Sequence, residues 1–131
     1  MRTFVGQLLV WTVVLLAVGC QKPASTGNAD DVKVELTVRP DPPKVGDAVF
    51  TVRLTSTDAK PVPGAVVRLE GNMNHAGMKP EFADAEETEP GQYEGNLQFT
   101  MGGDWFILVN ATLADGRKLK RKVDVPAVRS R

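Results

Sequence analysis

Residues 32–39 read Val-Lys-Val-Glu-Leu-Thr-Val-Arg, and this stretch decides the fold class. Aliphatic side chains occupy every even position, and charged or hydroxyl side chains occupy every odd one. This alternation is the period of a β-strand with one buried face. A helix would repeat its apolar positions about every 3.6 residues, and no stretch after residue 31 does so convincingly. The sequence therefore predicts a β-strand here and little helix beyond it.

Six further stretches alternate in the same way or are rich in β-branched and aromatic residues. They lie at residues 49–55, 65–70, 82–88, 93–101, 105–113 and 119–125, and 82–88 is the weakest of them. Stretch 105–113 is apolar on both parities, which predicts a strand covered on both faces. About seven short strands in under roughly 100 residues predict an all-β, immunoglobulin-like two-sheet sandwich. A small barrel is the alternative.

The first 19 residues resemble a bacterial lipoprotein signal peptide. Arg2 precedes an apolar run, and residues 16–19 (Leu-Ala-Val-Gly) lead to Cys20, the only cysteine of the chain. Attachment of a diacylglyceryl group to the Cys20 thiol and cleavage before Cys20 would anchor the protein in the bacterial cell envelope. Gln21 resembles the following residue of lipoproteins sent to the outer membrane, where the protein would face the periplasm of a Gram-negative host. An uncleaved anchor with an incidental cysteine is the alternative.

The remaining chain divides by composition. Residues 20–31 contain no aliphatic side chain larger than alanine after Cys20, so we expect a lipidated, flexible tether. Residues 32–126 suit one small domain, and residues 127–131 form a short tail. Sixteen basic and sixteen acidic residues cancel, which gives no electrostatic case for nucleic-acid binding. The run of basic residues at 118–122 is typical of a solvated strand face. The alternative is a patch that contacts anionic lipid or an acidic partner.

Residues 71–80 carry unusual chemistry for a loop. They contain Met73, Met78 and His75, which is the only histidine of the chain. Met101, the one other methionine beyond the initiator, ends a later predicted strand. Thioether sulfur and neutral imidazole are soft ligands that favour Cu(I) over hard cations. The pattern therefore predicts a metal site in this loop, beside which Met101 could lie, and the alternative is a loop whose methionines simply cap the core.

Several short motifs together resemble the YtkA-like domain family, and FixH-like proteins share the Gly-x-Trp region. The motifs are Pro42-x-x-x-Gly46, Pro61-Val62-Pro63-Gly64-Ala65-x-Val67, Met73-x-His75-x-x-Met78, Pro90-Gly91-x-Tyr93 and Phe99-x-Met101-x-Gly103-x-Trp105. The resemblance implies a small exported or membrane-anchored immunoglobulin-like domain linked to copper handling or to assembly of respiratory oxidases. It implies the ligands Met73, His75, Met78 and Met101. Many relatives have more histidine near the first methionine than this chain.

Enzyme activity has little support in the sequence, because it lacks a nucleophile with a general base and a phosphate-binding loop. Two functions remain. The first is a lipid-anchored protein that binds copper as Cu(I), for buffering or for exchange with a copper-donating or copper-accepting partner. The second is an immunoglobulin-like interaction module, or an accessory subunit of an envelope or respiratory assembly, without a metal. Glu86, Glu87 and Glu89 predict a solvated acidic loop, with a weak second metal site as the alternative.

Overall fold

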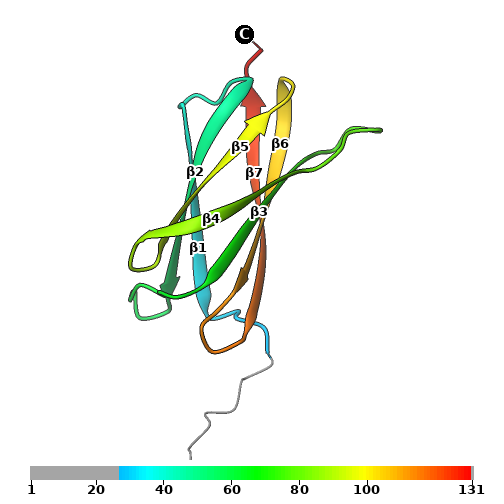
Figure 1. Ribbon diagram of the computed structural model, residues 1–131. Helices are drawn as coiled ribbons and strands as arrows, with labels where there is room; N and C mark the ends of the chain where they lie inside the picture. The colour runs from blue at the N-terminus through cyan, green and yellow to red at the C-terminus, as the bar shows by residue number, and fades with distance from the viewer. Residues whose placement is uncertain (1–26, 131) are drawn as a thin grey trace, which may run out of the picture.

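The computed structural model of the protein describes residues 27–130, and the regular elements within that range are all β-strands. Figure 1 shows them as seven long arrows. In chain order they are β1 (Val32–Arg39), β2 (Gly46–Ser56), β3 (Val66–Met73), β4 (Glu81–Glu89), β5 (Gln92–Phe99), β6 (Gly103–Thr112) and β7 (Lys118–Val128). The prediction of an all-β domain of about seven strands is confirmed, and the weakest stretch is strand β4. Residues 27–130 contain no helix that is long and apolar enough to cross a membrane.

The strands are hydrogen-bonded in the order β1-β2-β5-β4-β3-β6-β7, and each neighbouring pair is antiparallel. Strand β4 joins the two halves of this order. Its first part, Glu81–Ala85, pairs with β3, and its last part, from Glu86 to Glu89, pairs with β5. Chain segments flanking the two outer strands meet at the isolated bridges Asn28–Lys118 and Lys44–Arg129. The strands therefore form one continuous and nearly closed sheet.

The core is built from the inward parity of each strand. The rings of Phe50, Phe99 and Trp105 pack in succession within it, the first pair tilted and the second edge to face, with centroids 5.5 Å and 5.1 Å apart. Each such aromatic ring contributes about 1.5–3 kcal/mol through its burial. Among residues 27–130, no buried side-chain nitrogen or oxygen lacks a hydrogen-bond partner. An apolar core with satisfied polar groups thus holds the domain together.

Strand β6 differs from its prediction. Trp105, Ile107 and Val109 are buried, whereas Phe106 and Leu108 are only half-buried. No second layer covers the outer face of this strand in the described part of the chain. Lys122 partly shields it instead, with its ammonium 4.6 Å from the centre of the Phe106 ring. The expectation of a strand covered on both faces is therefore wrong.

The folded domain also extends beyond both of its predicted boundaries. Ala29 is only 1% exposed, and its amide donates a 3.0 Å hydrogen bond to the Lys118 carbonyl. Residues 27–31 thus pack on the start of β7 and are not part of a flexible tether. At the other end β7 runs to Val128, and the Arg129 amide donates to the Pro43 carbonyl over 2.9 Å. The predicted signal peptide (1–19) and Cys20 lie outside the described residues.

Candidate functional site

The loop between β3 and β4 leads away from the body of the domain, to the right in Figure 1. Its tip turns at Ala76 and Gly77, where Gly77 has a φ of 79°. The Met78 amide donates to the His75 carbonyl over 3.4 Å, and this bond closes the turn. His75, Ala76 and Gly77 are exposed. The hairpin therefore presents its one imidazole to solvent.

The imidazole has a defined hydrogen bond. His75 Nδ1 lies 3.0 Å from the carbonyl oxygen of Ala76. A carbonyl oxygen only accepts, so Nδ1 carries the proton in this contact. In the neutral ring the lone pair is then on Nε2. This is the tautomer in which a histidine binds a metal through Nε2 while its other nitrogen is held by the backbone.

Met73 is the last residue of β3 and pairs in register with Trp105 of β6. Its side chain is half-buried and packs against the edge of the core. A Cβ built on Gly103 would lie 2.9 Å from the Met73 methyl carbon, and Gly103 has a φ of 127°. Glycine at this position thus leaves room for the Met73 side chain and also allows the backbone conformation.

Met101 lies in the turn between β5 and β6, and its side chain is 40% exposed. The sequence predicts Met101 at the end of a strand over residues 93–101, and this is wrong because β5 ends at Phe99. The Met101 carbonyl accepts a 2.9 Å hydrogen bond from the Trp105 indole nitrogen. Trp105 thus joins the Met101 turn to the end of β3, because it pairs with Met73 and bonds Met101.

The four predicted ligands are therefore divided between two neighbouring features. Met73 and Met101 belong to strand ends that meet at Trp105, whereas His75 and Met78 belong to the projecting hairpin. Met78 is half-buried and packs against the edge of the core, like Met73. Within residues 27–130 no three His, Cys, Asp or Glu side chains are grouped as a metal site. The soft donors at this end are the thioethers of Met73, Met78 and Met101 and the imidazole of His75.

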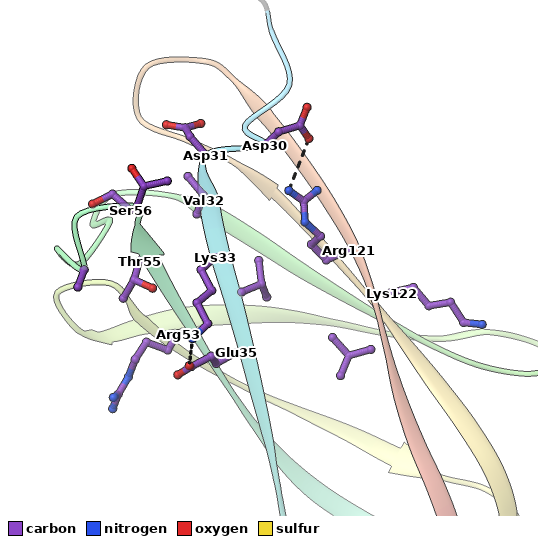
Figure 2. A pocket seen from close by; sticks show the side chains of 14 residues that line it. Asp30, Asp31, Val32, Lys33, Glu35, Arg53, Thr55, Ser56, Arg121 and Lys122 are labelled. Atoms are coloured by element: carbon purple, nitrogen blue, oxygen red, sulfur yellow. Dashed lines mark ion pairs between the residues drawn. The ribbon is translucent and has the colours of Figure 1, made fainter.

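A groove between β1 and β7 has a different character. Its volume is about 840 Å³, and Figure 2 shows Asp30, Lys33, Glu35 and Arg121 among its lining side chains. Lys33 and Glu35 approach to 2.8 Å, and Arg121 and Asp30 to 3.6 Å. Lys33, Glu35 and Asp30 are exposed and Arg121 is half-buried, and these charges pair with one another. The groove contains none of the methionines and does not contain the histidine, so we do not assign it to the candidate site.

The opposite end of β4 holds a polar arrangement that sequence reasoning missed. The buried Tyr93 hydroxyl donates to the Val62 carbonyl over 2.9 Å and accepts from the Ala65 amide over 3.0 Å. The Glu87 carboxylate accepts from the amides of Gly64, at 3.1 Å, and Gly91, at 3.3 Å. We call Tyr93, Glu87 and these backbone partners the tyrosine clasp. The motif Pro90-Gly91-x-Tyr93 was its only signal in the sequence.

The clasp shifts the pKa of both of its titratable groups. Burial, followed by the proximity of the Glu87 carboxylate, raises the pKa of Tyr93 to about 12. The Tyr93 hydroxyl and then the amides of Gly64 and Gly91 lower the pKa of Glu87. The Glu87 carboxylate therefore serves as a hydrogen-bond acceptor for backbone amides within the fold. This position does not support the alternative of a second metal site at Glu86, Glu87 and Glu89.

The fold and the candidate site together define a small all-β domain with a methionine- and histidine-bearing hairpin at one end. A family model described as YtkA-like matches residues 26–110. The chain belongs to the YtkA-like family. The matched range includes Met73, His75, Met78 and Met101, whereas Cys20 and strand β7 lie outside it.

Two solved structures resemble the chain weakly. One is a structure of murine CRIg, with 14% identity and a TM-score of 0.42, covering 76% of this chain and 98% of that chain. The other is the ZirS C-terminal domain, with 13% identity and a TM-score of 0.42, covering 100% of this chain and 87% of that chain. Scores of this size are too low to assign a shared fold. No curated protein matches the chain.

Proposed function

We propose that this protein is a lipid-anchored protein of the bacterial cell envelope that binds copper as Cu(I). Met73, His75, Met78 and Met101 would hold the metal, and Cys20 would carry the lipid. The protein would buffer copper or exchange it with a partner protein. In a Gram-negative host the absence of Asp after Cys20 favours the outer membrane, with the domain in the periplasm. Its strands would form an immunoglobulin-like sandwich of two facing layers, with β4 crossing from one layer to the other.

One observation carries the copper proposal. All three methionines outside the predicted signal peptide, together with the only histidine, lie in the β3–β4 hairpin or at the strand ends beside it. Met101 is 40% exposed, and His75 is exposed with its Nε2 lone pair directed to no backbone group. Thioethers and a neutral imidazole favour Cu(I), and thioethers, unlike thiols, carry no proton that a metal must displace. Core packing accounts for Met73 and Met78 but not for the exposed side chains of Met101 and His75.

Each residue would contribute in a different way. Met73 sits in a defined place against Gly103, so its thioether is oriented before any metal arrives. Met101 is joined to the same place through the Trp105 hydrogen bond. His75 and Met78 come from the projecting hairpin. Met73 and Met101 would thus form a fixed part of the site, and the hairpin would form an exposed part. Such a site suits exchange of a metal with a partner.

The alternative is an immunoglobulin-like interaction module or an accessory subunit of an envelope or respiratory assembly. Two observations favour it. Met73 and Met78 both pack against the edge of the core, which is a sufficient structural role for a methionine. A hollow of about 300 Å³ lies beside the hairpin, lined by Asn74, Asp104 and Trp105 among others, and offers a place for a partner side chain. In this account the hairpin is a contact surface.

Titration of the purified protein with Cu(I) against a competing chelator separates the two functions. The copper proposal predicts one tightly bound Cu(I), lost in a Met73→Leu, Met78→Leu double variant. Leucine approximately conserves the volume of methionine, so the core contacts of both positions are retained. Far-ultraviolet circular dichroism of the variant controls for folding. Absence of competitive binding by the folded wild-type protein would support the interaction module instead.

A further inference from the structure

The outer face of β3, β6 and β7 becomes basic toward the end where the N-terminal segment enters the domain. Cross-strand partners lie on the same face of a sheet, so the register defines rows across it. The first row is Val66, Thr112 and Lys118, and the second is Arg68, Asn110 and Lys120. We call Val66, Arg68, Lys118 and Lys120 the basic face. The rows nearer the Met73 end contain Glu70 with Lys122 and then Asp124, so the positive charge fades along the strands.

The basic face is open to solvent. Val66 is 74% exposed, and it lines a shallow hollow of about 370 Å³ with Arg68, Lys118 and Lys120. No carboxylate lines this hollow. Within residues 27–130 neither Lys118 nor Lys120 forms an ion pair, and Arg68 lies over the Phe82 ring at 4.9 Å. Asp84, the register partner of Arg68 on β4, lies beside Arg68 on the same face.

The acidic residues near the chain entry are already paired within the protein. Asp31 and Asp115 both form ion pairs with Arg117. Asp30 pairs with Arg121 at 3.6 Å, and Figure 2 shows this pair at the mouth of the β1–β7 groove. These carboxylates therefore do not cancel Lys118 and Lys120. An anionic surface that approached this end would meet cations and one exposed aliphatic side chain.

The length of the N-terminal segment determines which surface approaches. Residues 21–26 separate the predicted lipidation site from Gly27, whose carbonyl accepts a hydrogen bond from the Lys118 amide at 3.1 Å. Even fully extended, seven residue steps span no more than about 25 Å. We propose that the basic face rests on anionic phospholipid of the membrane that holds Cys20. This inference rests on the proposed lipid anchor and is independent of copper.

The lipid anchor allows even a weak contact between the basic face and the membrane to be populated. Each lysine or arginine at an anionic surface increases the population in contact by about fivefold. A tethered domain also meets the membrane at a high effective concentration, so a contact too weak to recruit a free protein is populated. Strand β6 runs from the chain entry to Gly103 and Trp105, and its 10 residues span about 30 Å. The Met–His hairpin lies at the far end of this span, so it would stay outside the membrane contact of the basic face.

The test uses the full-length lipoprotein in vesicles of phosphatidylcholine, with or without phosphatidylglycerol. The predicted lipidation of Cys20 leaves no other thiol, so a fluorophore on Val66→Cys or on Ala76→Cys reports one position. We expect quenching of the residue 66 label by aqueous iodide to fall about fivefold or more when phosphatidylglycerol is present. The label at residue 76, in the exposed hairpin, should be quenched equally in both vesicles. High salt should restore quenching at residue 66.

Charge reversal supplies the matched control. Lys118→Glu with Lys120→Glu should abolish the protection at residue 66, whereas Lys44→Glu with Lys79→Glu changes the net charge equally and should preserve it. Equal quenching at residue 66 in both vesicles, or equal loss in both double variants, would overturn the membrane contact. Flotation of the wild type and Cys20→Ser tests the anchor separately. A wild-type protein that floats with an unprotected residue 66 refutes the contact alone, and one that does not float refutes the anchor and the contact with it.

Discussion

The two turns at the ends of β4 carry family motifs of opposite character. At the β4–β5 turn, the polar groups of Tyr93 and Glu87 are bonded to backbone atoms of the preceding loop. At the β3–β4 hairpin, the His75 ring forms a hydrogen bond to the neighbouring Ala76 carbonyl and to no other group of residues 27–130, and the loop projects into solvent. The hydrogen bonds of the β4–β5 turn explain its residues by their role in the fold. The exposed residues of the β3–β4 hairpin have no such role, which favours a ligand or a partner outside the chain.

Glycine replacement should separate the two turns most strongly. A Cβ on Gly91 would lie 2.8 Å from Pro61 Cβ and 2.9 Å from the Leu54 oxygen, and its φ is 77°. We expect Gly91→Ala to lower the free energy of unfolding by about 3 kcal/mol. Gly77 has a similar φ of 79°, but a Cβ placed there would meet no atom within 4 Å. Gly77→Ala should therefore cost only about 1 kcal/mol, through backbone strain alone.

Urea denaturation of both variants measures the difference. Because the two glycines share their backbone conformation, the gap between the variants reports the crowding at Gly91. Equal losses of stability would show that the β4–β5 turn is no more tightly packed than the hairpin, and the contrast between the two turns would fail.

The tyrosine clasp is expected to give the next largest effect. Tyr93→Phe removes the hydroxyl that donates to Val62 and accepts from Ala65, and leaves both backbone groups without this partner. The free energy of unfolding should fall by about 2 kcal/mol. Cu(I) affinity of the folded variant should be unchanged, because the clasp lies at the other end of β4. Chemical denaturation and chelator competition check the two halves of this prediction, and a weakened Cu(I) affinity with normal folding would contradict it.

Acid should reveal the smallest effect. The folded pKa of Glu87 is lowered from its ordinary value of 4.5, so its stabilising contribution is present above that pH and is lost as the pH falls through the folded value. We expect Glu87→Gln to reduce the loss of stability between neutral and acidic pH. Denaturation curves of the two proteins across this range provide the measurement. Parallel pH profiles would show that the carboxylate is not linked to folding.

Local patterns in the sequence were sufficient to predict the strands. Alternation in residues 32–39 and in the later stretches depends only on which face of a strand is buried, and the structure has strands at all seven places. Predictions failed where a distant partner decides the outcome. Ala29 is buried because the Lys118 backbone, far along the chain, pairs with it. Phe106 stays half-exposed because no second layer covers β6 in the described part of the chain.

The sequence predicted which residues form the candidate site, but it did not predict how they are arranged in space. The sequence places Met73, His75 and Met78 in one loop, and the structure keeps His75 and Met78 there but makes Met73 the last residue of β3. It cannot reveal that Trp105 pairs with Met73 and bonds the Met101 carbonyl, since both contacts depend on strand register. The clasp was missed for the same reason. Tyr93 reads as an inward aromatic residue until the Val62 carbonyl is placed beside its hydroxyl.

The most direct test of the central claim is the Cu(I) affinity of Met101→Leu beside that of His75→Ala, measured by chelator competition. Met101 is 40% exposed and leucine nearly conserves its volume, so folding should be unaffected. If the hairpin and the β5–β6 turn form one site, both variants should bind Cu(I) at least about tenfold more weakly, or about 1.4 kcal/mol. Wild-type affinity in Met101→Leu with loss in His75→Ala would confine the site to the hairpin. Wild-type affinity in both variants would contradict the copper site.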